Sequence, residues 1–562
     1  MRREVSVVNK KVCSFPILFA LLALVIGTCA VVFPASAQAA PTSTGSITVS
    51  GTVASSYDAY QIFSANVVDG DSDAKIATDL AWAKDARDAV LPVLHSAGMP
   101  NSQTTAQEAA EWLNTDSHLT SALSAQLARS LQSSGAVPVA LNAGTAAELP
   151  CGYWLIVADD DAIAQGEAGT APIMALVGGS AVTVKPKAAT PKVSKHVLED
   201  STAAWQKAAD ATVADDLYWR LSATVPAGLT AYDTYTVRFV DTMSAGLDPS
   251  KAAASMRVYA AAGADGGFDA VSAGKDGRAG TEPAKGWTDI TAQCATKVAA
   301  DGKTFTVRTG DLIAALGGAD AFTTGARVVA VYNAPLNSAC NHGIAKGNPN
   351  EVYLRYPRSP VADQSGDAGF TRTPSDDACA YTWDLALTKR GSDGDKPLAG
   401  AVLSIADDRG RTLSADGTWD AEGKATVTTG EDGRVTVSGV DSGKLEVREL
   451  KAPKGYTAFE GTRSVTVKAE GLDVDQVAAA KPKLTITAES PLRADSADGS
   501  TGSLEASLIN TPTGTPPSIT TGGFMPSTGD MAMYAAAAAA VAGAALIVVA
   551  LLVKRGGGSH KE

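Results

Sequence analysis

Histidine is scarce in this sequence of 562 residues, and the patterns that carry catalysis are missing. The five histidines are not spaced as zinc ligands are in an H-E-x-x-H motif. No nucleophile-elbow, phosphate-binding or dinucleotide-binding glycine pattern stands before a helix, and the acidic run at residues 69–73 lacks the glutamate of an EF-hand loop. The sequence therefore predicts no metal site, no cofactor and no enzyme that turns over a substrate.

Positive charge and aromatic side chains are also in short supply. Lys and Arg number 47 against 60 Asp and Glu, which gives a formal net charge of −13. Nucleic-acid binding needs clustered basic residues, so this balance argues against it, while a mildly acidic surface keeps a secreted protein soluble. Aromatic residues make up 6% of the chain, which suffices for several modest cores. The length predicts three or four domains.

Only six cysteines occur, and two of them, Cys13 and Cys29, lie in an N-terminal processing segment. Four remain in the mature chain, at positions 151, 294, 340 and 379. An exported chain can form disulfides, and four cysteines permit three pairings. Cys294 and Cys340 fall in the same expected domain, so we predict that pair first. Four free or buried thiols are the alternative.

The first 39 residues have the composition of a secretory signal peptide. Four basic residues within the first eleven precede an apolar stretch at residues 15–33. Small-x-small cleavage patterns follow, and cleavage after Ala39 keeps Pro41 from standing directly behind the broken bond. We therefore expect a secreted mature chain that begins at residue 40. An uncleaved membrane anchor is the alternative.

The C-terminal end combines three features in a fixed order. Residues 531–553 are apolar and long enough for a transmembrane helix, and two basic residues follow on the expected cytoplasmic side. Just upstream stands the pentapeptide Met525-Pro526-Ser527-Thr528-Gly529. This order resembles the LPxTG sorting signal of Gram-positive surface proteins, with Met525 in place of Leu. The resemblance implies that a sortase cleaves between Thr528 and Gly529 and holds Thr528 as an acyl-enzyme. An ordinary tail anchor is the alternative.

Between these ends the chain divides into three expected domains of mainly β structure. Strand patterns and a helical stretch at about residues 105–131 indicate a first domain over residues 40–184. Short strands between Gly- and Asp-containing loops indicate immunoglobulin-like β-sandwiches over residues 195–362 and 380–511. The other segments are a Pro- and Lys-containing linker at 185–194, a Pro/Gly/Thr stalk at 512–524 and the sorting signal at 525–562.

One constellation in the third domain carries chemistry. Lys389 ends its first strand, Asn510 ends its last strand, and Glu449 lies between them in residues 445–456. That segment resembles the E-box Y-x-L-x-E-T-x-A-P-x-G-Y of pilin domains, and residues 397–401 also fit this family, the Cna-B-type immunoglobulin-like domain. The resemblance implies a spontaneous isopeptide bond between Lys389 and Asn510, with Glu449 as proton shuttle. Burial favours the reaction, since it lowers the pKa of an amine and raises that of a carboxyl group.

The second domain shows a similar layout with one departure. Lys195 stands near its start, and Asp241 lies in a segment that resembles the D-T-x-x-x-G-L motif of the fimbrial D2-type domain, whose Asp is a proton shuttle. Residues 347–360 resemble the last strand of that family, but Arg358 occupies the position of the acceptor Asn. An arginine cannot accept the amine. We therefore leave open whether Lys195 and Asp241 form an isopeptide site or only an ion pair.

The first linker holds the candidate residue for joining subunits. Residues 182–187 read VTVKPK and resemble the pilin motif, whose core is Tyr-Pro-Lys; Lys185 replaces the Tyr, while Pro186 and Lys187 match. The resemblance implies that Lys187 attacks the acyl-enzyme formed at Thr528 of another subunit, so that a covalent fibre grows head to tail. Lys192 and Lys185 are the alternative linking residues.

These motifs make the chain similar to the major (backbone) pilin of Gram-positive sortase-assembled fimbriae. The resemblance implies a cell-wall-anchored surface fimbrium, in the membrane only as a precursor, polymerised by a class C-type sortase and finally attached to peptidoglycan. Its implied partners are the sortase, identical subunits, accessory pilins and a host-surface ligand for adhesion. The alternative is an accessory pilin or a stand-alone wall-anchored adhesin, which needs Thr528 but no donor Lys187. The missing catalytic motifs disfavour a wall-anchored enzyme.

Overall fold

The computed structural model describes residues 43–51, 53–71, 74–115, 117–187, 190–263 and 286–514. The predicted signal peptide and the predicted sorting signal, including residues 525–529 and the segment expected to span the membrane, lie outside the described residues. Within the described ranges, no helix is both long and apolar enough to cross a membrane.

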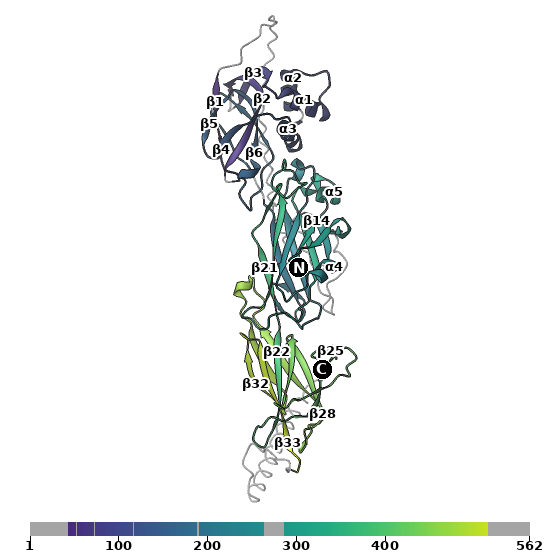
Figure 1. Ribbon diagram of the computed structural model, residues 1–562. Helices are drawn as coiled ribbons and strands as arrows, with labels where there is room; N and C mark the ends of the chain where they lie inside the picture. The colour runs from purple at the N-terminus through teal and green to yellow at the C-terminus, as the bar shows by residue number, and fades with distance from the viewer. Residues whose placement is uncertain are drawn as a thin grey trace, which may run out of the picture.

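Three β-rich domains follow one another along an elongated molecule (Figure 1). Strands form where inward and outward residues alternate. In β12 (Tyr218–Val225), for example, every second side chain from Trp219 onward is buried in the core. The second and third domains each enclose a buried apolar cluster of their own. The predicted fold class, a mainly β chain with tandem sandwich domains, is therefore confirmed.

The first domain contains a three-stranded sheet, a five-stranded sheet and three helices. The small sheet has the order β5-β1-β8, and the large sheet has the order β3-β2-β6-β7 with β4 paired to β2. The strands are β1 (Thr44–Val49), β2 (Ser56–Asp69), β3 (Lys75–Trp82), β4 (Val139–Asn142), β5 (Ala146–Pro150), β6 (Gly152–Ala158), β7 (Ile173–Val177) and β8 (Val182–Val184). The helices α1 (Arg87–Ser96), α2 (Ala106–Asn114) and α3 (Ser121–Ser133) share an apolar cluster with the large sheet.

The predicted helical stretch at residues 105–131 is divided into two helices. Thr105 caps α2 through a capping box with Glu108, and Thr120 caps α3 by accepting the backbone N–H of Leu123 at 3.1 Å. Both threonines have extended backbone conformations, so the chain cannot continue as one helix between α2 and α3.

The second domain is a sandwich of a six-stranded and a seven-stranded sheet. The first sheet contains, in order, β10 (Ala204–Gln206), β9 (Lys192–Glu199), β12, β18 (Ala326–Asn333), β14 (Arg257–Ala262) and β15 (Thr288–Asp289). The second contains β11 (Ala208–Asp210), β21 (Asp376–Tyr381), β19 (Asn348–Pro357), β13 (Arg238–Met243), β17 (Thr304–Arg308) and β16 (Ala295–Val298), with β20 (Phe370–Arg372) on β19. The short helices α4 (Pro249–Ser255) and α5 (Leu312–Ala315) lie in its loops. Strand β21 follows the expected domain end at residue 362 yet pairs with β19, so it belongs to this domain.

The third domain pairs a five-stranded with a seven-stranded sheet. The first contains, in order, β27 (Arg434–Val440), β22 (Trp383–Gly391), β33 (Ser503–Pro512) and β29 (Tyr456–Thr457), with β32 (Leu492–Asp498) on β33. The second contains β25 (Trp419–Asp420), β24 (Thr412–Leu413), β23 (Val402–Ala406), β28 (Gly443–Lys451), β30 (Thr462–Glu470) and β31 (Lys483–Ala488), with β26 (Val427–Thr428) on β23. Only Thr382 separates β22 from β21 of the second domain.

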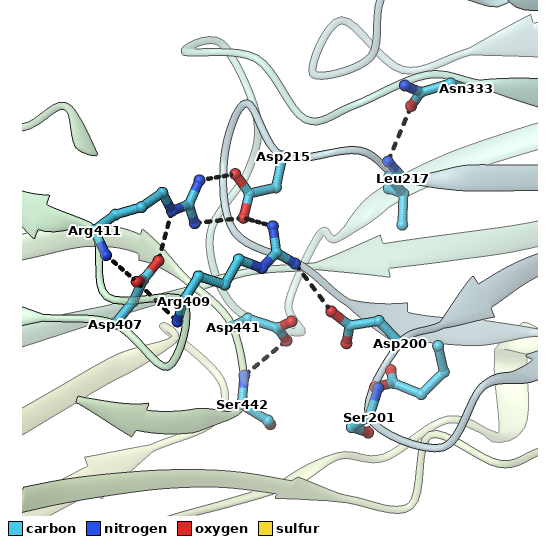
Figure 2. A network of polar contacts seen from close by, with 11 residues as sticks. Asp200, Ser201, Asp215, Leu217, Asn333, Asp407, Arg409, Arg411, Asp441 and Ser442 are labelled. Carbon is cyan, nitrogen blue, oxygen red and sulfur yellow. Dashed lines mark hydrogen bonds and ion pairs between the residues drawn. The ribbon is translucent and has the colours of Figure 1, made fainter. Parts of the chain in front are cut away.

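Two arginines of the third domain bind acidic residues of the second (Figure 2). Arg411 makes two hydrogen bonds to Asp215, from Nη1 to Oδ1 at 2.5 Å and from Nη2 to Oδ2 at 2.7 Å. Arg409 Nη1 donates to the same carboxylate at 2.9 Å. Close by, Trp383 Nε1 donates to Asp210 Oδ2 at 2.6 Å. A planar, two-point contact restricts rotation, so this network holds the two domains in one orientation.

Replacing Arg411 by Ala should weaken the docking of the third domain on the second. The variant loses charged hydrogen bonds to a largely buried carboxylate, which contributes about 1–3 kcal/mol. We expect the free energy of unfolding to fall by that amount in urea denaturation of the full chain. Lys424→Ala is the matched control, because the Lys424–Glu422 pair is 77% and 74% exposed and exposed pairs contribute less than about 1 kcal/mol. Equal losses in the two variants would contradict the role of Arg411.

Candidate amide-forming sites

In the third domain, Lys389, Glu449 and Asn510 lie together in the core. Lys389 on β22 and Asn510 on β33 come from neighbouring parallel strands, in which Lys389 is opposite Leu508, two residues before Asn510. The alternation of side chains turns both residues inward. Glu449 reaches the same place from β28 of the facing sheet, where it is the last inward-facing residue.

The three side chains are in contact and closed off from solvent. Asn510 Nδ2 donates to both Glu449 carboxylate oxygens, at 2.9 and 3.0 Å. Lys389 Nζ lies 3.7 Å from Glu449 Oε1 and donates to the backbone O of Leu508 at 3.1 Å. The side chains of Lys389 and Glu449 have no exposed surface. Burial lowers the pKa of Lys389 to about 8, although the negative charge of Glu449 acts in the opposite direction.

This arrangement supplies the parts that an amide-forming reaction needs. The lowered pKa gives Lys389 a larger fraction of neutral amine, the nucleophilic form, near neutral pH. Asn510 Oδ1 has no hydrogen-bond partner, while Nδ2, the atom that would leave as ammonia, is bound to Glu449. A carboxyl group in this position can transfer a proton from the attacking amine to the leaving nitrogen.

A second buried lysine and carboxylate meet in the second domain. Lys195 on β9 forms an ion pair with Asp241 on β13, and neither side chain has exposed surface. The hydroxyl of Tyr332 on β18 accepts a hydrogen bond from Lys195 Nζ and donates one to Asp241 Oδ2, both at 2.9 Å. Burial lowers the pKa of Lys195 to about 8, against the opposing charge of Asp241. Burial also raises the pKa of Asp241, against the opposing charge of Lys195.

Asn350 on β19 completes this group, although the sequence motifs did not indicate it. Its side chain is fully buried, and its Nδ2 donates to the Tyr332 hydroxyl at 3.0 Å. In the β13–β19 ladder Asn350 is opposite Met243, two residues after Asp241, so Asn350 and Asp241 share an inward face. Its Oδ1 has no hydrogen-bond partner, as at Asn510. The second domain therefore holds the same three kinds of group as the third.

Arg358, assigned from sequence to the acceptor position, lies elsewhere, so that assignment is wrong. It follows the end of β19, and its Nη1 donates to the backbone O of Asp160 in the first domain at 2.6 Å. Arg358 therefore joins two domains instead of facing Lys195. The alternation along β19 carried the missing signal, because it turns Asn350 inward in step with Val352.

Lys187 is exposed at the junction between the first and second domains. It lines a cleft of about 230 Å³ whose walls also include Ala168, Pro226 and Tyr232. Lys185 and Lys192 are exposed as well, but neither belongs to the lining of this cleft, and Lys192 is part of β9. Thr528, the residue expected to react with Lys187 of another subunit, lies outside the described residues.

The predicted disulfide between Cys294 and Cys340 is wrong, because all four cysteines of the described residues are free thiols. Cys294 Sγ donates to the backbone O of Ile290 at 3.3 Å, and Cys340 Sγ lies 3.6 Å from His342 Nε2. Two cysteines of one domain form a disulfide only when their Cβ atoms approach to about 4 Å. In the part of the chain that the structure describes, no group of three or more His, Cys, Asp or Glu is arranged to hold a metal ion.

Comparison in sequence identifies relatives of the third domain. A family model described as the SpaA prealbumin-like fold domain matches residues 384–481, a range that contains Lys389 and Glu449. Over 143 residues the chain is 30% identical to the trypsin-resistant surface T6 protein of Streptococcus pyogenes serotype M6. This alignment covers 24% of the chain and 24% of the relative, so the chain spans about a quarter of the length of the curated protein that it matches.

Similar solved structures include three major pilins. The T6 backbone pilin of serotype M6 Streptococcus pyogenes aligns with a TM-score of 0.46 and 17% identity, over 84% of this chain and 98% of that one. The full-length major pilin SpaD of Corynebacterium diphtheriae aligns with a TM-score of 0.42 and 15% identity, over 84% and 100%. The major pilin SpaA of the same organism aligns with a TM-score of 0.38 and 13% identity, over 83% and 99%. The third domain is thus similar to the SpaA prealbumin-like fold domain, and the predicted similarity of the chain to the backbone pilins of Gram-positive bacteria is confirmed.

Proposed function

We propose that this chain is the structural backbone subunit of a covalent pilus. The group formed by Lys389, Glu449 and Asn510 is the observation that carries the proposal. Burying three polar groups away from water costs free energy, and a domain that served only as a passive spacer would gain nothing from it. The exposed Lys187 in a cleft at a domain junction supports the same reading.

Each core site closes an amide within its own domain. Lys389 Nζ attacks the side-chain carbonyl carbon of Asn510, the bond from that carbon to Nδ2 breaks, and Glu449 transfers the proton with which ammonia leaves. In the second domain Lys195 and Asn350 react in the same way, with Asp241 as the proton shuttle. The reaction removes the buried lysine charge and takes place once in each molecule, so it is not enzymatic turnover.

A different lysine joins the subunits to one another. A class C-type sortase cleaves the Thr528–Gly529 bond, and the resulting Thr528 acyl-enzyme is attacked by the amine of Lys187 on the next subunit. Repetition gives a head-to-tail fibre, and a last transfer to peptidoglycan anchors it in the cell wall. The amine is open to such an attack because Lys187 is exposed in its cleft between the first two domains. Accessory pilins and adhesion to a host-surface ligand fit this role.

The second candidate function is an accessory pilin or a stand-alone wall-anchored adhesin. Such a protein needs the acceptor Thr528 but no donor lysine. The position of Lys187 between two domains favours the backbone subunit, since an amine there is reached by another chain without disturbing either core. The two functions differ in whether the mature protein is a polymer.

The mature chain should lack two molecules of ammonia relative to its sequence. Each Lys–Asn amide releases one, so intact-mass spectrometry should show a deficit of about 34 Da. Glu449→Ala should restore about 17 Da by blocking the third domain alone, and Asp241→Ala should restore the same mass in the second. Thr242→Ala, an exposed neighbour on β13, is the control and should keep the full deficit. A wild-type chain with unaltered mass would rule out both amides.

Lys389→Ala should lower the free energy of unfolding of the third domain. The amide closes a loop of about 120 residues, and a cross-link of that span contributes about 4–5 kcal/mol by restricting the unfolded chain. Glu449→Gln keeps the side-chain shape but removes the proton shuttle, so it should lose a similar amount. Lys396→Ala, on the surface of the same domain, serves as control in calorimetry of the full chain. Equal stability of the Lys389 and Lys396 variants would contradict the cross-link.

Wall extracts boiled in SDS should show a ladder of multimers on a gel. Lys187→Ala should reduce the ladder to monomer, because no amine then resolves the acyl-enzyme at Thr528. Lys185→Ala and Lys192→Ala are matched controls on the same segment, and both should keep the ladder. A single band in the wild type would favour the stand-alone adhesin. A ladder that persists in the Lys187→Ala variant would show that another lysine forms the link between subunits.

A further inference from the structure

A cysteine, a histidine and an aspartate form a chain of contacts where the second domain meets the third. Cys340 Sγ lies 3.6 Å from His342 Nε2, within hydrogen-bond distance for sulfur. His342 Nδ1 lies 2.8 Å from Asp384 Oδ2, near the start of β22. A proton on Nδ1, directed at the carboxylate, leaves Nε2 with a lone pair toward the thiol. Cys340 and His342 come from the second domain and Asp384 from the third, so docking of the two domains completes the group.

The backbone on both sides fixes this geometry. Asp384 Oδ1 accepts hydrogen bonds from Ser438 Oγ at 2.6 Å and from the N–H of Gly439 at 3.0 Å, which leaves Oδ2 for the imidazole. Gly343, directly after the histidine, has a φ of +75°, and a Cβ there would lie 2.4 Å from the backbone N of Gly502 in the third domain. The loop that carries the thiol and the imidazole is therefore pressed against the third domain.

The thiol and the imidazole open into a cleft of about 460 Å³ at this junction. Its walls also include Ser338, Trp419 and Arg411. Arg411 is already bound to Asp215 and Asp407, as Figure 2 shows, so the cleft offers aromatic and hydroxyl groups and the Asp416 carboxylate but no free positive charge. The imidazole side chain is 26% exposed, and it can therefore be reached from solvent. A cleft of this size and lining suits a small, uncharged organic molecule.

We propose that Cys340 is a nucleophilic thiol that forms a mixed disulfide with a small-molecule disulfide in this cleft, with His342 as its base and Asp384 as the positioning residue. The thiol proton passes to His342 Nε2 while Cys340 Sγ attacks one sulfur of the reagent. A new S–S bond forms, the S–S bond of the reagent breaks, and the departing thiolate takes the proton from the imidazolium. Cys340 is oxidised, and the second sulfur of the reagent is reduced to a thiol.

Cys340 differs from the other thiols in having a base. Burial raises the pKa of its thiol, and the negative charge of Asp384 acts in the same direction, so a free thiolate is disfavoured and a proton acceptor is needed. Among the described residues, the other three cysteines have no imidazole contact. Cys294 and Cys379 donate to backbone carbonyls, and Cys151 accepts from a serine hydroxyl. The site uses none of the lysines of the proposed function and stands independently of it.

The test exposes the purified full chain to bis(2-hydroxyethyl) disulfide and follows each cysteine by peptide mass spectrometry. We expect Cys340 to gain one hydroxyethylthio group at least roughly 100-fold faster than Cys294 near neutral pH. The Cys294 rate should rise with pH, because burial raises the pKa of that thiol to about 11.

His342→Gln should slow Cys340 to the rate of Cys294, whereas Ser338→Ala, another cleft residue, should leave the Cys340 rate unchanged. Equal rates for Cys340 and Cys294 in the wild type, or a Cys340 rate that His342→Gln leaves unchanged, would overturn the proposal. Labelling of the buried Cys379 reports unfolding of a variant. If His342→Gln exposes Cys379, the Asp384→Asn variant decides between the outcomes. A slower Cys340 with Cys379 still protected supports the proposal, and a wild-type Cys340 rate overturns it.

Discussion

A lysine ammonium in the solvent-free core of a β-sandwich is the constraint on which both core sites depend. Its desolvation costs several kcal/mol, and a single ion pair repays this only with good geometry and further hydrogen bonds. In each of the two domains the lysine has a carboxylate beside it and an asparagine within the same cluster, drawn from facing sheets. The proposed amide removes the charge altogether, because the lysine nitrogen becomes a neutral N–H. The polar cluster that is hardest to accommodate in the core is thereby converted into a cross-link.

The position of the proposed Lys389–Asn510 cross-link suits it to resist a pulling force. Lys389 and Asn510 lie near the ends of the first and last strands of the third domain, and these strands are parallel neighbours. A force that pulls on a fibre enters a domain through its first strand and leaves through its last. The proposed amide between the two would carry such a force without loading the hydrogen bonds of the sheet. Only Thr382 separates β21 from β22, and Arg411 binds Asp215 across the junction, so tension in the proposed fibre would pass directly from one domain to the next.

Local patterns predicted the strands and the inward positions well, and long-range contacts poorly. The resemblance to the E-box of pilin domains grouped Lys389, Glu449 and Asn510 from sequence. The structure fits that grouping, because alternation turns each residue inward and the first and last strands are neighbours. Arg358 was misplaced because its partner belongs to another domain, which no periodicity along β19 encodes. The predicted pairing of Cys340 with Cys294 also failed, because the Cys340 sulfur contacts His342 of its own loop. No periodicity in the sequence indicated the cleft that Cys340 and His342 line between the second and third domains.

In the proposed reaction, the carboxylates of the two core sites act at opposite ends of the proton transfer. Glu449 binds the leaving nitrogen of Asn510 directly and stands 3.7 Å from the lysine. Asp241 instead pairs with the attacking amine of Lys195, and the Tyr332 hydroxyl lies between it and Asn350. In the second domain the amine must give its proton to Asp241 before it attacks, and burial assists this step because it raises the pKa of that carboxyl group. The tyrosine hydroxyl then offers a path from the aspartate to the leaving nitrogen. The longer side chain of Glu449 in the third domain and the Tyr332 hydroxyl in the second therefore have the same proposed role. Each helps to move one proton from the lysine nitrogen to the asparagine nitrogen.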